Sequence, residues 1–168
     1  NFAYHGANRL GANSLLSCIF DGLFGGTCIR NYITDVGPSS ADLPPQPYEA
    51  VEAQETARQD RLLKSTGGQN PYLLWQEMGK AMTDTCTVVR HNERLEKTLA
   101  QCQDWKERYG RVQLSDTGMW TNQNLSFSRA LRDMIVMAEA ILKGALVRNE
   151  SRGAHFKPAF PERDDAAF

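Results

Sequence analysis

Apolar residues recur at helical spacing through the second half of the chain. The longest pattern repeats at steps of four and three over residues 127–145, and two shorter stripes cover residues 75–89 and 95–105. The stripe members are Trp75, Met78, Met82, Cys86 and Val89; Leu95, Leu99, Cys102 and Trp105; and Phe127, Leu131, Met134, Ala138, Ile141 and Ala145, widened by Ile135 and Leu142. Because short connections between such helices favour antiparallel neighbours, the pattern predicts a bundle of about three long helices.

Polar and helix-breaking residues predict where these helices begin and end. Asn70 before Pro71 is typical of a capped helix start with proline in the first turn. The stretch 91–93 predicts a break and a new start, and Gly110 suits the position just past a helix end. Beyond Arg148, prolines favour an irregular tail.

The first half of the chain is predicted to hold two further helices with a linker between them. Helical spacing predicts a buried helix over residues 14–32, although its three glycines weaken it by about 1 kcal/mol each. Its apolar positions are Leu15, Leu16, Ile19, Phe20 and Leu23. Prolines make residues 37–47 an extended linker, and a polar helix is predicted over residues 48–64.

Composition narrows the class of protein. With 168 residues, of which 41% are hydrophobic and 23% charged, the chain can build a core of ordinary size. A net charge of −1 gives no reason to expect a nucleic-acid partner. No apolar run approaches the ~20 residues that span a bilayer, and no signal peptide is visible.

The four cysteines lack the spacing of a metal site, so no metal is expected. Three of them, Cys18, Cys86 and Cys102, occupy apolar helix positions and are predicted to be buried, reduced thiols.

The most informative stretch is HGANRLGANSLL at residues 5–16. Its small residues let the backbone approach a flat group closely, and Asn13 is a good N-cap for the helix that follows. A helix start presents free N–H groups and partial positive charge, while Arg9 carries a planar fork that matches a carboxylate or phosphate. These features predict a site for an anion or an electron-rich cofactor. A capped helix beside a surface arginine is the alternative.

This stretch resembles the segment of the succinate dehydrogenase and fumarate reductase flavoprotein subunits that closes over the isoalloxazine ring. The tail resembles the same family at Arg148, at ESRGAH (residues 150–155) and at PERDD (residues 161–165). The resemblance implies a mainly α fold. Residues 1–47 would be the end of the FAD-binding domain, with the flavin loop, a helix and the proline-rich linker. Residues 48–168 would be an antiparallel helical C-terminal domain with an irregular tail.

The resemblance also implies site residues. Arg9 would bind a carboxylate of succinate or fumarate, and His5 would lie near the same site. The backbone of Ser14 and Leu15 would contact the flavin pyrimidine ring, next to Asn13. No catalytic residue is expected within the chain, because the family's proton-relaying arginine and flavin-linking histidine belong to upstream sequence.

No glycine-rich dinucleotide-binding turn follows a strand anywhere in the sequence, although this family needs one to hold FAD. The chain also begins with Asn1 rather than Met. It is therefore interpreted as a piece from the C-terminal side of a larger subunit, with the main FAD-binding unit upstream. Alone, the piece is predicted to be inactive, neither retaining FAD nor oxidising succinate.

The implied function is oxidation of succinate to fumarate by hydride transfer to FAD. Electrons would pass through an iron–sulfur subunit to quinone, in a complex held by membrane-anchor subunits at the cytoplasmic face of the bacterial inner membrane. Fumarate reductase and L-aspartate oxidase are the alternative flavoenzymes, although residues 11–12 and 163–165 fit the dehydrogenase better than the oxidase. A non-catalytic helical interaction module would account for the bundle but not for the loop.

Two tail residues, Arg152 and His155, are candidates for catalytic residues, because the family's tail motif includes a residue near the flavin and either of them could be that residue. The favoured interpretation is structural, because a charge cluster more often forms ion pairs than a site. The predicted network consists of Glu150, Arg152, Arg163, Asp164 and Asp165.

Overall fold

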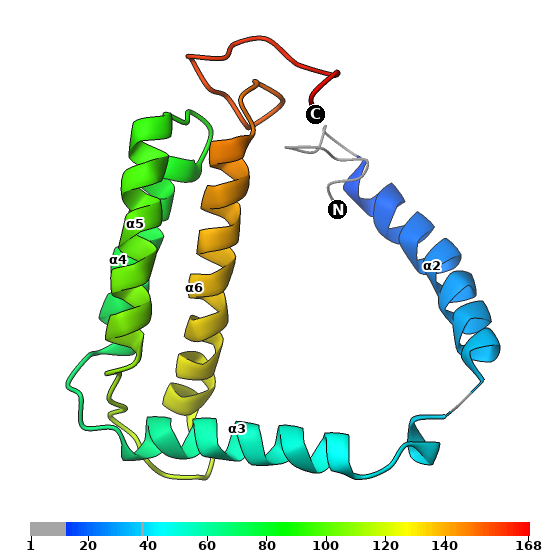
Figure 1. The fold of residues 1–168 in the computed structure, drawn as a ribbon, viewed down its shortest axis with the longest axis vertical. Helices are drawn as coiled ribbons and strands as arrows, with labels where there is room; N and C mark the ends of the chain where they lie inside the picture. Colours follow the sequence, from blue (N-terminus) through cyan, green and yellow to red (C-terminus); the bar gives the residue numbers. More distant parts are fainter. Residues whose placement is uncertain (1–12, 38) are drawn as a thin grey trace. The chain divides into compact units, whose positions relative to one another are not determined.

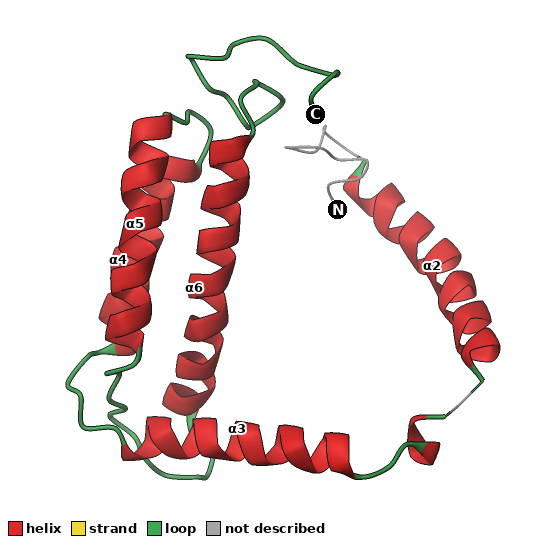
Figure 2. Cartoon of the chain, in the orientation of Figure 1, coloured by secondary structure: helices red, strands yellow, loops and turns green. Residues whose placement is uncertain are grey.

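The computed structural model describes residues 13–37 and 39–168. Its helices are α2 (Ser14–Val36), the short 3-10 helix η1 (Ser40–Asp42), α3 (Gln46–Lys64), α4 (Pro71–Cys86), α5 (Asn92–Tyr109) and α6 (Gln123–Val147). No strand occurs in the described ranges, so the predicted mainly α fold class is confirmed (Figures 1 and 2). The chain divides into two compact units, Asn1–Glu52 and Ala53–Phe168, and the division falls within α3.

The second unit is built on a three-helix bundle, as predicted. Each of α4, α5 and α6 packs against the other two, and successive helices run in opposite directions (Figure 1). The core consists of side chains from all three helices together with residues of the 110–122 connection and of α3. Its buried apolar members are Leu62, Leu74, Met78, Cys86, Leu95, Cys102, Trp105, Val112, Leu114, Leu125, Leu131, Ile135, Ala138, Leu142 and Ala145.

Most of the predicted stripe positions on α4 and α6 are buried, and the differences concern positions at the edges of each stripe. The buried predicted positions are Met78, Cys86, Leu131, Ile135, Ala138, Leu142 and Ala145. On α4 Leu74 is fully buried, whereas Trp75 is 42% exposed and rests edge-on against Phe127, with ring centroids 5.9 Å apart. On α6 the stripe centres on Ile135 and its neighbours, so that Met134 and Ile141 lie at its exposed edge. Neighbouring positions on a helix lie about 100° apart, so a stripe that includes both Met134 and Ile135 is wider than the contact, and spacing alone does not resolve which of its edges is buried.

Two further stripe predictions have clear outcomes. Val89 is exposed because α4 ends at Cys86, so this residue belongs to the connection rather than to the helix. The α5 stripe is confirmed, with Leu95, Cys102 and Trp105 buried.

Local chemistry at the helix ends accounts for most of the boundaries. Asn70 caps α4 as predicted, because its Oδ1 accepts hydrogen bonds from the backbone N–H of Tyr72 (2.9 Å) and Leu73 (3.3 Å), and Pro71 occupies the first turn. The break before α5 is also confirmed. Gly110 directly follows the last residue of α5, as predicted, and it adopts a right-handed conformation (φ −58°).

Helix α2 does not form the buried helix predicted from its spacing. It extends to Val36, beyond the expected end, and its large apolar side chains are exposed. These side chains are Leu15, Leu16, Ile19, Phe20, Leu23, Phe24, Ile29, Tyr32, Ile33 and Val36. The prediction of a buried thiol is likewise wrong for Cys18, which is exposed on this helix, and right for Cys86 and Cys102.

No helix in residues 13–37 and 39–168 combines the length and apolarity that crossing a lipid bilayer requires.

Candidate functional site

The predicted cofactor residues Asn13, Ser14 and Leu15 lie at the start of α2. Asn13 occupies the N-cap position, but its side chain makes no capping hydrogen bond, which corrects the prediction of a side-chain cap. Its backbone carbonyl instead accepts the Ser17 hydroxyl at 2.7 Å and the Ser17 N–H at 3.1 Å. The first turn contains no acidic residue, so the positive end of the helix dipole keeps its charge.

The side-chain oxygen of Asn13 is the unusual atom here. This Oδ1 is buried and has no hydrogen-bond partner in the described structure. A buried acceptor without a donor costs about 1–3 kcal/mol, so such atoms in folded proteins commonly mark a ligand or an ordered water. Asn13 also lines a cavity of about 390 Å³ together with Leu16, Ser17 and Phe20.

These residues fit one edge of a flavin. The isoalloxazine ring is flat and largely apolar, and its pyrimidine end carries both carbonyl oxygens and an N–H group. An apolar cavity wall suits the ring face, helix N–H groups suit the carbonyl oxygens, and the unpartnered Asn13 oxygen suits the N–H. The two predicted substrate residues, His5 and Arg9, lie outside the described residues.

The tail forms the predicted ion-pair network around one buried carboxylate. The Glu150 side chain has no exposed surface and accepts two hydrogen bonds from Arg152, at 2.9 and 3.1 Å. It also accepts the Asp164 backbone N–H at 2.9 Å and lies 3.4 Å from Arg148. The Arg152 hydrogen bonds, aided by that backbone donor, hold the pKa of Glu150 at about 2, below its ordinary 4.5.

Asp165 extends this network to the end of the chain. It binds Arg152 at 2.7 Å and Arg163 at 2.6 Å. The Asp164 carboxylate does not join the ion pairs, because its Oδ1 accepts the backbone N–H groups of Ala166 and Ala167. The arrangement fixes the tail.

His155 is fully occupied by hydrogen bonds. Its Nδ1 lies 2.6 Å from Nη1 of Arg90, and its Nε2 lies 2.8 Å from the carbonyl oxygen of Arg148. Since an arginine only donates, Nδ1 must accept and the proton must reside on Nε2, which donates to the carbonyl. Burial, together with the charges of Arg90 and its neighbours, lowers the pKa of His155. This neutral ring has a structural role, so the catalytic candidacy of His155 has no support in the geometry.

Sequence reasoning missed two cations beside this histidine, Arg90 and Lys157. Lys157 is 1% exposed, and its Nζ donates to the carbonyl of Leu146 and to Oδ1 of Asn149, both at 3.0 Å. No periodic pattern marks either residue, because each follows a helix end or lies in an irregular segment. Within residues 13–37 and 39–168, no group of three or more His, Cys, Asp or Glu side chains is placed to hold a metal ion.

Comparison with known proteins identifies the family. A sequence model described as "Fumarate reductase flavoprotein C-term" matches residues 75–168. The succinate dehydrogenase flavoprotein subunit of Bacillus subtilis (strain 168) is 40% identical over 165 residues, which cover 98% of this chain and 28% of that protein. The fumarate reductase flavoprotein subunit of Escherichia coli (strain K12) is 33% identical over 169 residues, covering 98% of this chain and 27% of that protein.

Comparison with solved structures supports the same family. An E. coli quinol fumarate reductase superposes with a TM-score of 0.86 at 33% identity, over 98% of this chain and 28% of that one. The Mycobacterium smegmatis Sdh1 complex superposes with a TM-score of 0.79 at 30% identity, over 95% of this chain and 26% of that one. The chain thus spans less than a third of the length of these relatives. It belongs to the succinate dehydrogenase and fumarate reductase flavoprotein family, in which it matches the C-terminal part.

Proposed function

We propose that this chain is part of the flavoprotein subunit of a succinate dehydrogenase, which oxidises succinate to fumarate. The supporting observation is the 40% identity to the B. subtilis succinate dehydrogenase flavoprotein, against 33% to the E. coli fumarate reductase flavoprotein over nearly the same residues. The chain spans only 28% of the dehydrogenase subunit, so the activity belongs to a longer protein.

In this proposal the first unit contributes to the flavin and substrate site. Asn13, Ser14 and Leu15 would contact the pyrimidine end of FAD, which supplies the hydride-accepting centre when bound. The positive end of α2 stabilises negative charge at that end of the ring. Arg9 would bind a substrate carboxylate through two parallel hydrogen bonds, with His5 beside it. Residues 1–47 would then belong to the FAD-binding domain and residues 48–168 to the helical domain.

The same proposal includes partners. Electrons would leave through an iron–sulfur subunit and reach quinone in a complex with membrane-anchor subunits. The flavoprotein would lie at the cytoplasmic face of a bacterial inner membrane, bound through those subunits. Support comes from two solved structures that resemble this chain, a quinol–fumarate reductase with menaquinol molecules and the Mycobacterium smegmatis Sdh1 in complex with UQ1.

Fumarate reduction is the second candidate. Its support is the E. coli quinol fumarate reductase, whose backbone superposes with the higher TM-score, 0.86 against 0.79 for the mycobacterial Sdh1 complex.

One preparation of the full-length flavoprotein with its partner subunits separates the two directions. Succinate-dependent reduction of an electron-accepting dye and fumarate-dependent oxidation of a reduced viologen are measured at equal enzyme concentration. Faster succinate oxidation is the expected result. Faster fumarate reduction would reverse the assigned direction, and a protein without bound flavin would contradict both candidates.

A further inference from the structure

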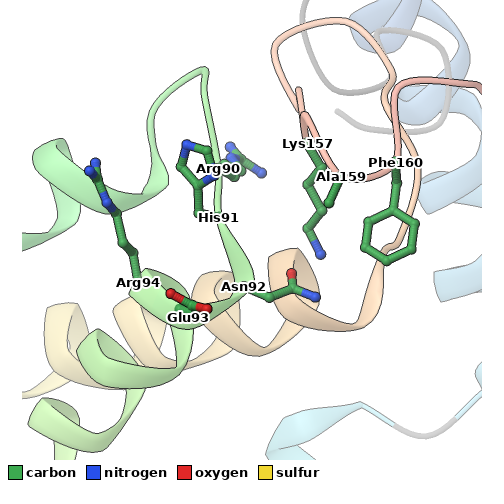
Figure 3. Close-up of a pocket in the computed structure, with 8 residues that line it drawn as sticks. All are labelled: Arg90, His91, Asn92, Glu93, Arg94, Lys157, Ala159 and Phe160. Atoms are coloured by element: carbon green, nitrogen blue, oxygen red, sulfur yellow. The ribbon is translucent and has the colours of Figure 1, made fainter.

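A second cavity lies in the helical unit. It has a volume of about 440 Å³ and lies between the start of α5 and the tail segment 157–160 (Figure 3). Its lining residues are Arg90, His91, Asn92, Glu93, Arg94, Lys157, Ala159 and Phe160. Pockets of a few hundred Å³ are large enough for a small ligand.

The charges on this lining are unbalanced. Arg90, Arg94 and Lys157 carry positive charge, and Glu93 is the only carboxylate of the lining. None of these three cations has an ion-pair partner in the part of the chain that the structure describes. Arg90 donates instead to neutral acceptors: the carbonyl oxygens of Thr87 (3.0 Å) and Cys86 (3.2 Å), and His155.

Lys157 is the cation of this lining that most requires an anionic partner, because its side chain is buried. Two of its three ammonium protons nevertheless meet neutral oxygens, and the positive charge of Arg90 repels it. Its remaining favourable contact is the Phe160 ring, whose centroid is 5.9 Å from Nζ. Burial and the charge of Arg90 lower the pKa of Lys157. Buried charges in proteins are normally paired, so this ammonium lacks the anion that its surroundings require.

Two neutral features narrow the class of anion. The His91 side chain does not cap α5, so the first-turn N–H groups of this helix remain available at the cavity. Asn92 donates its Nδ2 to Asn149 at 3.3 Å, and its own Oδ1 is buried without a partner in the described structure. In Figure 3 this oxygen points toward the space beside Lys157. An acceptor among cations suits an anion that also carries an O–H group, as phosphate does near neutral pH.

We propose that this cavity binds a phosphate group, with Lys157, Arg94 and the α5 N-terminus holding its ionised oxygens and Asn92 accepting its O–H. The source is either inorganic phosphate or a small phosphate monoester, because both present the same group. All of the described residues that line the pocket belong to the second unit, so the proposal is independent of the flavin assignment.

The test is a nuclear magnetic resonance titration of the 168-residue chain at constant ionic strength, balanced with chloride. Inorganic phosphate, glycerol phosphate, sulfate and succinate are added separately. Saturable amide shifts confined to residues 90–94 and 157–160 are expected with phosphate. Glycerol phosphate tells whether the pocket accepts an ester. A response to sulfate or succinate as strong as that to phosphate, or no saturable response, would overturn the proposal.

Three substitutions on one helix turn sharpen this test. Arg94, Glu93 and Lys97 are all exposed and make no ion pair with a described residue, so their replacement leaves the fold intact. Arg94→Gln should weaken phosphate binding about tenfold or more, the worth of one charge-assisted hydrogen bond. Glu93→Gln should tighten it, because the one repelling carboxylate is removed. Lys97→Gln, which does not line the cavity, is the control. Equal affinities in all three variants would contradict the assigned site.

Discussion

Leu131 is the position at which the register of the bundle can be tested most sharply. It lies on α6, has no exposed surface and belongs to the core shared by α4, α5 and α6. Leu131→Ala removes three buried carbon atoms, and their transfer to water costs about 0.8 kcal/mol each. The cavity left among helices that cannot fully collapse adds further cost, so we expect a loss of about 3–4 kcal/mol in the free energy of unfolding.

Two methionines on the same helix provide graded controls. Met134 is 37% exposed and Met137 is 60% exposed. Met134→Ala should cost about 1–2 kcal/mol, since part of the side chain already lies in water. Met137→Ala should stay within about 0.5 kcal/mol of the parent, because alanine favours helix and little burial is lost.

Tryptophan fluorescence during urea unfolding measures the free energy of unfolding of the second unit in each variant. The three tryptophans, Trp75, Trp105 and Trp120, all lie in the second unit, and Trp105 is buried on α5. The signal therefore follows the bundle and not α2. A thermal melt should show the Leu131 variant shifted by about 10 °C or more.

The order of the three costs is the decisive result. Equal losses for Leu131→Ala and Met134→Ala would restore the register predicted from sequence spacing and contradict the one in the structure. A larger loss for Met137→Ala than for Leu131→Ala would mean that the exposed face of α6 is the packed one.

Three further predictions concern the tail, the loops and the proposed substrate site. Arg152 holds the folded pKa of Glu150 at about 2, below the ordinary 4.5. This carboxylate therefore contributes stability that is complete above pH 4.5 and is lost as the pH falls through 2. The free energy of unfolding of Glu150→Gln, measured with urea, should depend less on pH in that window. An unchanged dependence on pH would contradict the role of Glu150. Gly67→Ala should lower the melting temperature, because a Cβ there would lie 2.4 Å from the Arg111 carbonyl oxygen, while Gly79→Ala in α4 meets nothing within 4 Å and should add about 0.5–1 kcal/mol. In the full-length flavoprotein, Arg9→Lys should abolish most succinate turnover while flavin absorbance remains, since lysine lacks the bidentate fork; near-normal turnover would exclude a carboxylate contact by Arg9.

The sequence predicted the bundle well because its helices bury a single face each. On α5 a charged surface surrounds Leu95, Cys102 and Trp105, so spacing alone fixes the buried face. On α6 apolar residues also occupy neighbouring positions, and Met134 and Ile141 fit the same periodicity as Ile135 and Leu142. When the apolar face of a helix is wider than the surface that packs against its neighbours, periodicity predicts the helix. It does not predict which of the apolar side chains are buried.

Helix α2 shows the opposite failure. Its spacing satisfies the pattern of a buried helix, yet its apolar side chains are exposed in this chain. Amphipathic spacing indicates that one face of a helix favours burial. It does not indicate which surface packs against that face. The exposure of α2 therefore does not contradict its spacing, which gives the apolar face and leaves its covering surface undefined.

The tail was predictable as a charge cluster but not as a set of pairings. Glu150, Arg152 and Asp165 could be grouped from sequence, because opposite charges near one another tend to pair. Which carboxylate becomes buried depends on backbone donors such as the Asp164 N–H, which irregular loops place without any periodic signal. The burial of Lys157 was equally unpredictable. Here an irregular segment buries a cation, and the ammonium group donates to neutral oxygens rather than to a carboxylate. Amino-acid composition does not show that a buried cation lacks a carboxylate partner. That becomes evident only when the burial and the hydrogen-bond partners of the side chain are known, so the second cavity could not be predicted from the sequence.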